Sequence, residues 1–290
     1  MQDDDATQAA VRRAFSETAD PSAHVPRPAT EAVLESLLQW CRGDGVGSTV
    51  AALAAPPGFG KTHLLRVLEA RLAETDGEAT PLDRDRRYSA CHALYLPYAA
   101  LSLSDLCDWV HGLLGRDRPA RSSAASADER ALKALARLAD AGQRPFHLLI
   151  DDADSMPSTT LRTLAQGLAS EASPLRLVLA LSDDSRSTRL LAAFDALHPF
   201  ELSYRSALDE RETEAYLRAR LGRAGLGVEV LDGLDPLTVA RIRALSGGVP
   251  RRIHRVVGSL VEPERAALAR ALSGYPRSDA WLGRPMEEIV

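Results

Sequence analysis

The sequence predicts an α/β protein with a parallel sheet, followed by a small domain that is entirely helical. Short apolar runs alternate with stretches of helical periodicity up to Leu208, and this alternation is typical of βαβ units. From Leu208 onward the apolar runs stop, while helical patterns with capping residues continue. The expected strands are 49–54, 93–96, 146–150, 177–181 and 200–202.

Four segments are expected along the chain. Residues 1–27 are polar and have no periodic apolar pattern, so we expect them to form a flexible N-terminal arm. The segments that follow are the α/β domain (28–205), the helical domain (206–273) and a C-terminal tail (274–290).

Two capping signals mark helix starts in the helical domain. Asp209 and Glu212 have the spacing of a capping box. Asp235 precedes Pro236, as an N-cap precedes a proline at the first helical position. These signals support a helical domain after the last strand.

Composition narrows the class of protein. Of the 290 residues 45% are hydrophobic, and the net charge of −5 argues against a surface that grips nucleic acid throughout. The cysteines at 41, 91 and 107 form no CxxC pair, which fits a reduced cytosol and favours neither disulfides nor a zinc site. An acidic start and the absence of an apolar run of about 18 residues predict a cytoplasmic protein without direct membrane insertion.

The segment 55–62, Ala-Pro-Pro-Gly-Phe-Gly-Lys-Thr, follows an apolar run and precedes a helical pattern, as a phosphate-binding loop requires. Backbone N–H groups and the helix N-terminus would bind the β-phosphate of ATP. Lys61 suits the β- and γ-phosphates, and the Thr62 hydroxyl suits Mg²⁺. Lys61 and Lys133 are the only lysines, and the other cations are arginines. A lysine at position 61 therefore suggests that an arginine could not replace it at the phosphates. The expected nucleotide-binding residues are Pro57, Gly58, Phe59, Gly60, Lys61, Thr62 and His63.

One position departs from the pattern GxxxxGK[ST], since Ala55 stands where the first glycine is expected. A Gly/Pro turn could imitate the motif by chance. The flanking strand and helix patterns favour the phosphate loop.

A second motif lies at the end of the expected strand 146–150. The strand runs into Asp151 and Asp152, and the carboxyl end of a buried parallel strand lies at the ligand crevice. Two acids there need a cation, so we assign Asp151 to Mg²⁺ and Asp152 to water activation. Asp154 has a different expected role, the N-cap region of the next helix. An acidic surface turn is the alternative for the pair.

Together these motifs resemble the AAA+ ATPases over residues 28–260. The resemblance implies a three-layer, parallel-sheet P-loop NTPase core with a small C-terminal all-α lid. The phosphate loop and acidic strand look like bacterial replication initiators. The string Ser246-Gly-Gly-Val-Pro-Arg251 looks more like ExeA-type secretion and TniB-type transposition ATPases, and we favour this second branch.

The resemblance also implies further catalytic residues. Arg251 corresponds to the sensor-2 arginine, which reaches the γ-phosphate, and Ser182 to the sensor-1 position, which orients water. A surface arginine and a serine in an ordinary turn are the alternatives. Relatives carry a trans-acting arginine just before the last strand, where residues 196–199 have none. Arg186 or Arg189 could substitute, or both could be surface residues.

These features predict an AAA+ ATPase that binds ATP and Mg²⁺ and hydrolyses ATP slowly, because Asp152 stands where most relatives have glutamate. We expect binding and hydrolysis to switch the assembly of a partner protein complex, with a nucleotide-dependent homo-oligomer as one form of assembly. Two alternatives stay open: a DNA-associated regulator of transposition or replication, and a non-catalytic nucleotide-gated scaffold.

Overall fold

A computed structural model describes residues 2–44, 47–75, 93–113, 146–169, 175–227 and 234–260, with positions 128, 130, 131, 133 and 135. The chain divides into two compact units. The α/β unit comprises 18–208 and 249–251, and the helical unit comprises 1–17, 209–248 and 252–290. The expected tail at 274–290 lies outside the described residues.

The α/β unit is built on a five-stranded parallel sheet with the order β2-β3-β4-β1-β5. Its strands are β1 (Val50–Ala54), β2 (Ala93–Leu96), β3 (Phe146–Ile150), β4 (Leu175–Leu181) and β5 (Phe200–Ser203). Ala54 pairs with Leu181 on one side and with Ser203 on the other, so these strands end at the same edge. The predicted fold class is confirmed, and β4 begins two residues earlier than expected.

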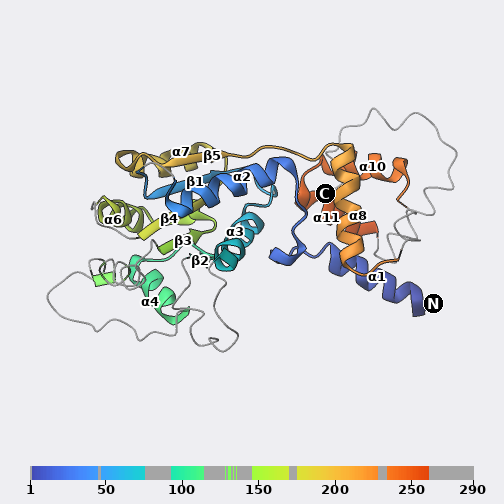
Figure 1. The fold of residues 1–290 in the computed structure, drawn as a ribbon, viewed down its shortest axis with the longest axis horizontal. Helices are drawn as coiled ribbons and strands as arrows, with labels where there is room; N and C mark the ends of the chain where they lie inside the picture. Colours follow the sequence, from blue (N-terminus) through green and yellow to red (C-terminus); the bar gives the residue numbers. More distant parts are fainter. Residues whose placement is uncertain are drawn as a thin grey trace, which may run out of the picture. The chain divides into compact units, whose positions relative to one another are not determined.

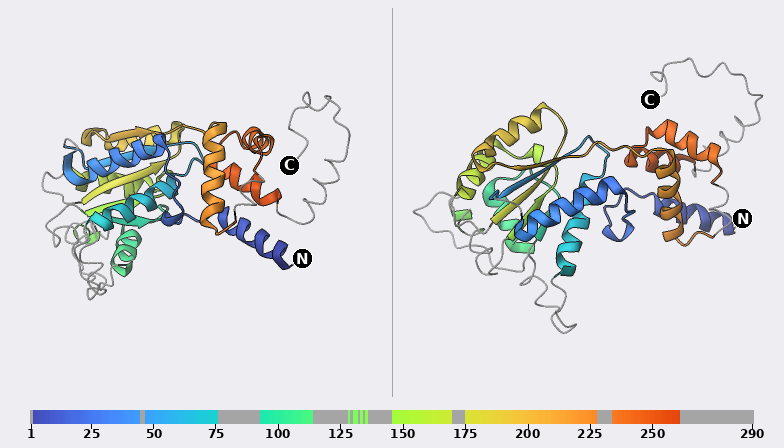
Figure 2. Two further views of the ribbon diagram at one scale, coloured as in Figure 1. Left: turned by 45° about the vertical axis from the view of Figure 1, so that its right-hand side comes forward. Right: turned by 45° about the horizontal axis from the view of Figure 1, so that its top comes forward.

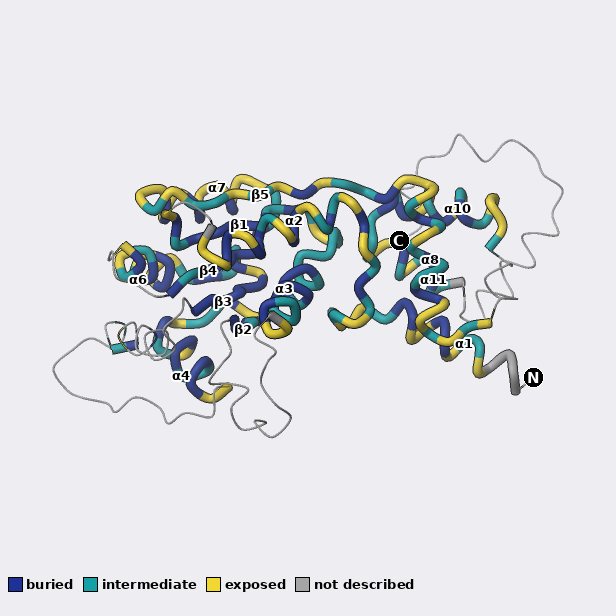
Figure 3. Tube along the Cα trace, in the orientation of Figure 1, coloured by how far each residue is buried: buried dark blue, intermediate teal, exposed yellow. Residues whose placement is uncertain are grey.

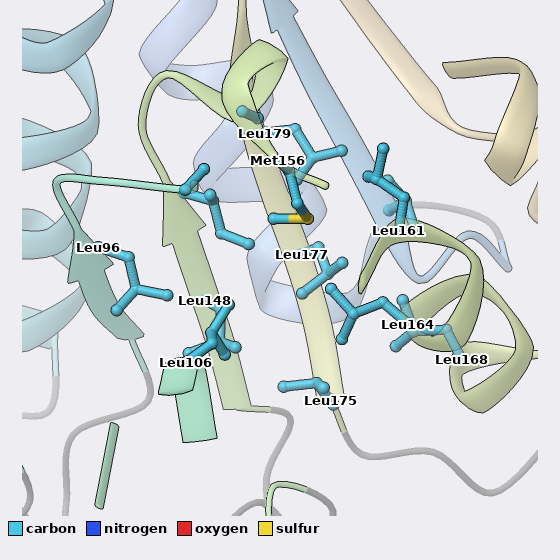
Figure 4. Packing of buried hydrophobic residues seen from close by; sticks show 14 of the residues in the cluster. Leu96, Leu106, Leu148, Met156, Leu161, Leu164, Leu168, Leu175, Leu177 and Leu179 are labelled. Carbon is cyan, nitrogen blue, oxygen red and sulfur yellow. The ribbon is translucent and has the colours of Figure 1, made fainter. Parts of the chain in front are cut away.

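Helices cover both faces of the sheet, which gives three layers (Figures 1 and 2). One face carries α2 (Pro28–Gln39) and α3 (Lys61–Thr75); the other carries α4 (Leu103–Leu113), α6 (Ser158–Leu168) and α7 (Ser185–Leu191). Strand side chains alternate between the faces, so Leu148 packs in the second layer (Figure 4) and Leu149 in the first.

The central strands are buried on both faces (Figure 3), as a parallel sheet between two helical layers requires. This explains why they read as continuous apolar runs rather than as alternating patterns. Short helical turns complete the unit: η1 (Pro21–Ala23), η2 (Trp40–Asp44), η4 (Ala153–Ser155) and η5 (Ala192–Leu197).

The helical unit contains α1 (Gln2–Ala14), α8 (Glu210–Arg223), α10 (Pro236–Ser246) and most of α11 (Pro250–Leu260). Both predicted helix starts occur: Asp209 and Glu212 form a capping box, and Asp235 accepts a hydrogen bond from the Thr238 amide. The buried side chains include Leu217, Leu221, Val239, Ile242, Ile253 and Val257. Among the described helices, none has the length and hydropathy needed to cross a bilayer.

The first 27 residues differ from the expected flexible arm, since α1 is a helix and residues 1–17 belong to the helical unit. Its buried positions 10, 11, 14 and 15 form one stripe of a helix, but two of them are alanines, so the apolar signal is weak. The Arg220 side chain donates to the Ala14 carbonyl oxygen at 2.8 Å, and the Phe15 ring packs edge-on against His254 with centroids 5.5 Å apart.

His254 makes the stability of the helical unit depend on pH. Burial lowers its pKa to about 4, and the Arg220 charge adds to the effect. Its Nε2 lies 2.7 Å from the Tyr216 hydroxyl. Because this folded-state pKa lies below the unfolded value, the unfolded state binds more protons between about pH 6.5 and pH 4. Stability from His254 is therefore complete above about pH 6.5 and is lost as the pH falls toward 4.

We predict that the urea-unfolding free energy of the helical unit falls between pH 7.5 and pH 5, by up to about 2 kcal/mol because of the lowered His254 pKa. His254→Leu removes the titrating group, so this variant should lose less stability over the same interval, whatever its stability at pH 7.5. An equal fall in unfolding free energy in the wild type and in His254→Leu would contradict the role of His254 in this pH dependence.

Candidate functional site

The phosphate loop joins β1 to α3 and turns through two glycines with left-handed backbone, Gly58 at φ 86° and Gly60 at φ 93°. Ala55, which replaces the expected first glycine, is fully buried. Among described non-glycine residues only Asp152 and His198 have positive φ, so Ala55 needs no glycine-like conformation. The departure from the motif therefore carries no backbone strain.

Lys61 lies in the first turn of α3. Its ammonium group donates to the Ala55 carbonyl oxygen at 2.6 Å. Burial lowers the pKa of Lys61; Asp151 and Asp154 oppose this effect, and the Arg251 charge adds to it. A buried cation beside a second cation favours an anionic ligand, because the ligand's charge would stabilise both.

Arg251, at the start of α11, belongs to the α/β unit. Its backbone N–H donates to the Gly58 carbonyl oxygen at 3.2 Å. A Cβ on Gly58 would lie 3.1 Å from Val249 Cγ1 and 3.2 Å from Arg251 Cβ. Gly58 is thus required for close approach as well as for its backbone conformation, and the structure places Arg251 beside the loop.

Asp151 is buried at the carboxyl end of β3. One carboxylate oxygen accepts from the Tyr95 hydroxyl at 3.0 Å, and the other accepts from the Asp152 amide at 3.0 Å. Burial and the Asp151 charge raise the pKa of Tyr95, which therefore stays a donor. Tyr95 is not recognisable as a site residue from the sequence, because a tyrosine in a short apolar strand looks like a core residue.

Asp152 adopts a left-handed conformation, φ 48° and ψ 42°, and is exposed. Its backbone carbonyl accepts from the Ser155 amide at 2.9 Å, while its side chain makes no capping hydrogen bond. Aspartate tolerates this conformation better than most residues, and such outliers concentrate at functional sites. The carboxylate is therefore available to act on a water molecule.

Ser182 follows β4, and its amide donates to Asp154 Oδ2 at 2.6 Å. Asp154 Oδ1 accepts from the Ser187 hydroxyl, also at 2.6 Å. Asp154 is therefore not an N-cap of α6 as expected, because Pro157 occupies that position and the carboxylate instead reaches the β4–α7 connection. No sequence period relates residues 154 and 182, so the sequence alone could not reveal this contact.

The expected nucleotide-binding residues around the loop also make contacts with residues from near the start and near the end of the segment 18–208. Phe59 packs edge-on against Tyr204, with ring centroids 6.2 Å apart. His63 Nε2 lies 3.2 Å from His24 Nδ1, and the other ring nitrogen of His24 lies 2.7 Å from a Glu31 carboxylate oxygen. No motif in the sequence marks His24 for this contact. Pro57 and Thr62 lie in the loop and at the start of α3.

The two candidate trans-acting arginines, Arg186 and Arg189, are exposed on α7. The Arg189 side chain donates to the Ser185 carbonyl oxygen at 3.2 Å, within its own helix.

Magnesium fits the oxygen atoms available here. Asp151 and Thr62 supply hard oxygen ligands, which Mg²⁺ prefers. The described residues contain no group of three or more His, Cys, Asp or Glu side chains that could hold a metal. Mg²⁺ needs no such cage, since it is usually held by one or two protein oxygens, water and substrate phosphates.

Comparison with known proteins agrees with this geometry. The sequence model of a family described as the AAA domain matches residues 45–190, half of the chain. No curated protein sequence matches this chain significantly.

Solved structures with the same fold include the following three proteins. The ORC2 protein of Aeropyrum pernix, in ADPNP–ADP complexes, matches with 18% identity and a TM-score of 0.59, over 90% of this chain and 68% of its own. Cdc6p of Pyrobaculum aerophilum matches with 20% identity and a TM-score of 0.60, over 89% of this chain and 66% of its own. Domain III of the replication initiation protein DnaA from Thermotoga maritima matches with 14% identity and a TM-score of 0.50, over 91% of this chain and 93% of its own. The likeness to replication initiators is confirmed at the level of the fold.

We predict that Gly58→Ala destabilises the α/β unit by about 1–2 kcal/mol in urea unfolding, because the new Cβ meets Val249 and forces alanine into a left-handed conformation. Gly112→Ala is the matched control. Gly112 is exposed in α4 with open space at its Cβ, so alanine there should be neutral or stabilise by up to about 1 kcal/mol. Equal effects would contradict close packing at Gly58.

Proposed function

Because the chain belongs to the AAA domain family, we propose that it binds ATP with Mg²⁺ and hydrolyses the nucleotide slowly. The observation that carries this proposal is the position of Lys61. Its ammonium group is partly buried beside the loop carbonyls, and the nearby acids Asp151 and Asp152 follow β3, a buried strand of the same sheet that is separated from β1 by β4. A partly buried lysine near two acids at the end of a parallel sheet suits a phosphate chain that carries a divalent cation.

Each residue has a role that follows from its chemistry. Lys61 would neutralise the β- and γ-phosphates, and the N–H groups of the loop and the first turn of α3 would bind phosphate oxygens. Thr62 and Asp151 would hold Mg²⁺, which when bound neutralises charge on the phosphates. The Tyr95 hydroxyl fixes the orientation of the Asp151 carboxylate before any ligand enters.

Three further residues would act on the γ-phosphate side. Asp152 would orient and deprotonate the attacking water, and Ser182 would hold that water or the γ-phosphate. Arg251 would stabilise negative charge on the γ-phosphate. From Arg252 onward, α11 belongs to the helical unit. A change in the position of Arg251 on nucleotide binding would therefore act on a helix of that unit.

Hydrolysis is expected to be slow for two reasons. The Asp152 carboxylate is one methylene shorter than a glutamate, which moves it back by about 1.5 Å, and catalysis is sensitive to such displacements. The chain also lacks an arginine at residues 196–199, just before β5. Arg186 and Arg189 remain candidates to complete the site of a neighbouring copy in a nucleotide-dependent homo-oligomer.

We predict that Lys61→Ala abolishes binding of fluorescent ATP, whereas Asp152→Asn leaves binding within about twofold and lowers turnover at least tenfold. Lys61 supplies charge to the bound phosphates, and Asp152 acts on the water that attacks them. Nucleotide titration and phosphate release measure the two effects.

Lys133→Ala is the control, because Lys133 is the only other lysine and is exposed. Equal ATP affinity in Lys61→Ala and Lys133→Ala would refute the phosphate-loop assignment. A wild-type turnover above about 10 s⁻¹ without a partner would contradict slow hydrolysis.

The physiological role we propose is a nucleotide-controlled switch in the assembly of a protein complex. Two arginines of the helical unit are paired with acids: Arg218 with Glu214, and Arg255 with Glu17. Together with the net charge of −5, this favours a protein partner over DNA. A DNA-associated regulator is the second candidate, and the fold shared with the DnaA replication initiation protein is the observation that favours it.

We predict that the protein with a non-hydrolysable ATP analogue binds duplex DNA more weakly than about 1 µM at near-physiological salt. A titration of labelled duplex measures this. Submicromolar binding that is lost in the Arg252→Glu/Arg255→Glu variant, and kept in an Arg162→Glu control at an exposed position of α6, would favour the DNA-associated role instead.

A further inference from the structure

We propose that Asp154 is a positioning residue for hydrolysis, an inference that rests on the proposed ATPase function. Its carboxylate binds Ser182, the residue assigned to the γ-phosphate side, by a backbone hydrogen bond of 2.6 Å. The same carboxylate binds the Ser187 hydroxyl at 2.6 Å. Through these contacts, Asp154 sets the position of Ser182 relative to Asp151 and Asp152, the two acids just before Asp154 in the sequence.

Asp154 lies in η4, the turn that immediately follows Asp151 and Asp152. Ser182 and Ser187 lie in the connection from β4 and in the first turn of α7. The carboxylate therefore joins the carboxyl ends of two adjacent strands, β3 and β4, at a point where the sheet pairing has ended. A charged acceptor strengthens both bonds compared with a neutral one.

The peptide between Leu181 and Ser182 is held from both sides. Its N–H donates to Asp154, and its carbonyl accepts from the Ala55 amide at 3.1 Å. The Ala55 carbonyl in turn accepts from the Lys61 ammonium group. One chain of hydrogen bonds thus links the turn after the acidic strand, the Ser182 segment, the first loop residue and the loop lysine.

This series of hydrogen bonds explains why the position of Ser182 should matter more for ATP hydrolysis than for ATP binding. The Asp154 carboxylate fixes the Ser182 end of the linking peptide, whereas Ala55 and Lys61 are also held by β1 and α3. Loss of the carboxylate frees the Ser182 amide and the start of the β4–α7 connection, and leaves the phosphate loop attached to β1. Misplacement by about 1 Å lowers catalytic rates strongly while ground-state binding persists.

The test compares two substitutions of Asp154 in the full chain. Asp154→Ala should lower kcat about tenfold or more, with the KM for ATP and the Kd for ADP within about threefold of wild type. Asp154→Asn should keep kcat within about threefold. Its amide oxygen can accept from the Ser182 N–H, and its NH₂ can donate to Ser187, whose hydroxyl can turn toward Asp184, 3.4 Å away.

Amide hydrogen exchange at Ser182 is a readout independent of activity, and it should rise at least about tenfold in Asp154→Ala but stay near wild type in Asp154→Asn. Wild-type kcat, or unchanged Ser182 exchange, in Asp154→Ala would overturn the proposal. Loss of ADP binding in that variant would also overturn it, because the carboxylate would then hold the fold rather than the site. Absence of hydrolysis in the wild type is a different result and contradicts the proposed function itself.

Discussion

The parallel register of the central strands is the constraint on which the site depends. β1 lies between β4 and β5, and β4 lies between β1 and β3, so the segments that leave these strands emerge at one edge. At this edge, the phosphate loop directly follows β1, Asp151 directly follows β3 and Ser182 directly follows β4. A one-residue slip in one pairing would reverse the faces of that strand and remove its group from the site. The two leucine-rich layers that hold the strands in register therefore also hold the candidate site residues in position.

Charge at this edge is balanced rather than uniform. Burial makes the charged form of Lys61 less favourable, Arg251 adds to that effect, and the acids at 151, 152 and 154 oppose it. Each acid has a different environment: Asp151 is buried and oriented by Tyr95, Asp152 is exposed, and Asp154 is bound to a backbone amide and a hydroxyl. Three aspartates within four residues thus have three different environments, which sequence spacing alone does not distinguish.

The sequence predicted those features that repeat with a period or follow a local rule. The strands, the loop between β1 and α3, and the caps at Asp209 and Asp235 are of this kind, because burial on both faces and helix starts leave local patterns. The contacts that join distant segments were not predicted. Asp154 resembled a cap because serine and proline follow it, and Tyr95 resembled a core residue. The stripe on α1 went unrecognised because alanines contribute little to an apolar pattern.

The division of the helical unit between the two ends of the chain has a consequence for folding during synthesis. The Ala14 carbonyl and the Arg220 side chain that binds it are 206 residues apart. At ordinary translation rates of about 5–20 residues per second, α1 would wait for about 10–40 s before its partner helix leaves the ribosome. The apolar stripe ending at Phe15 stays uncovered by α8 for that time, while the sheet forms from the residues between them. α1 is therefore made before the sheet but reaches its native contacts with α8 after it, and a chaperone has an interval in which to bind it.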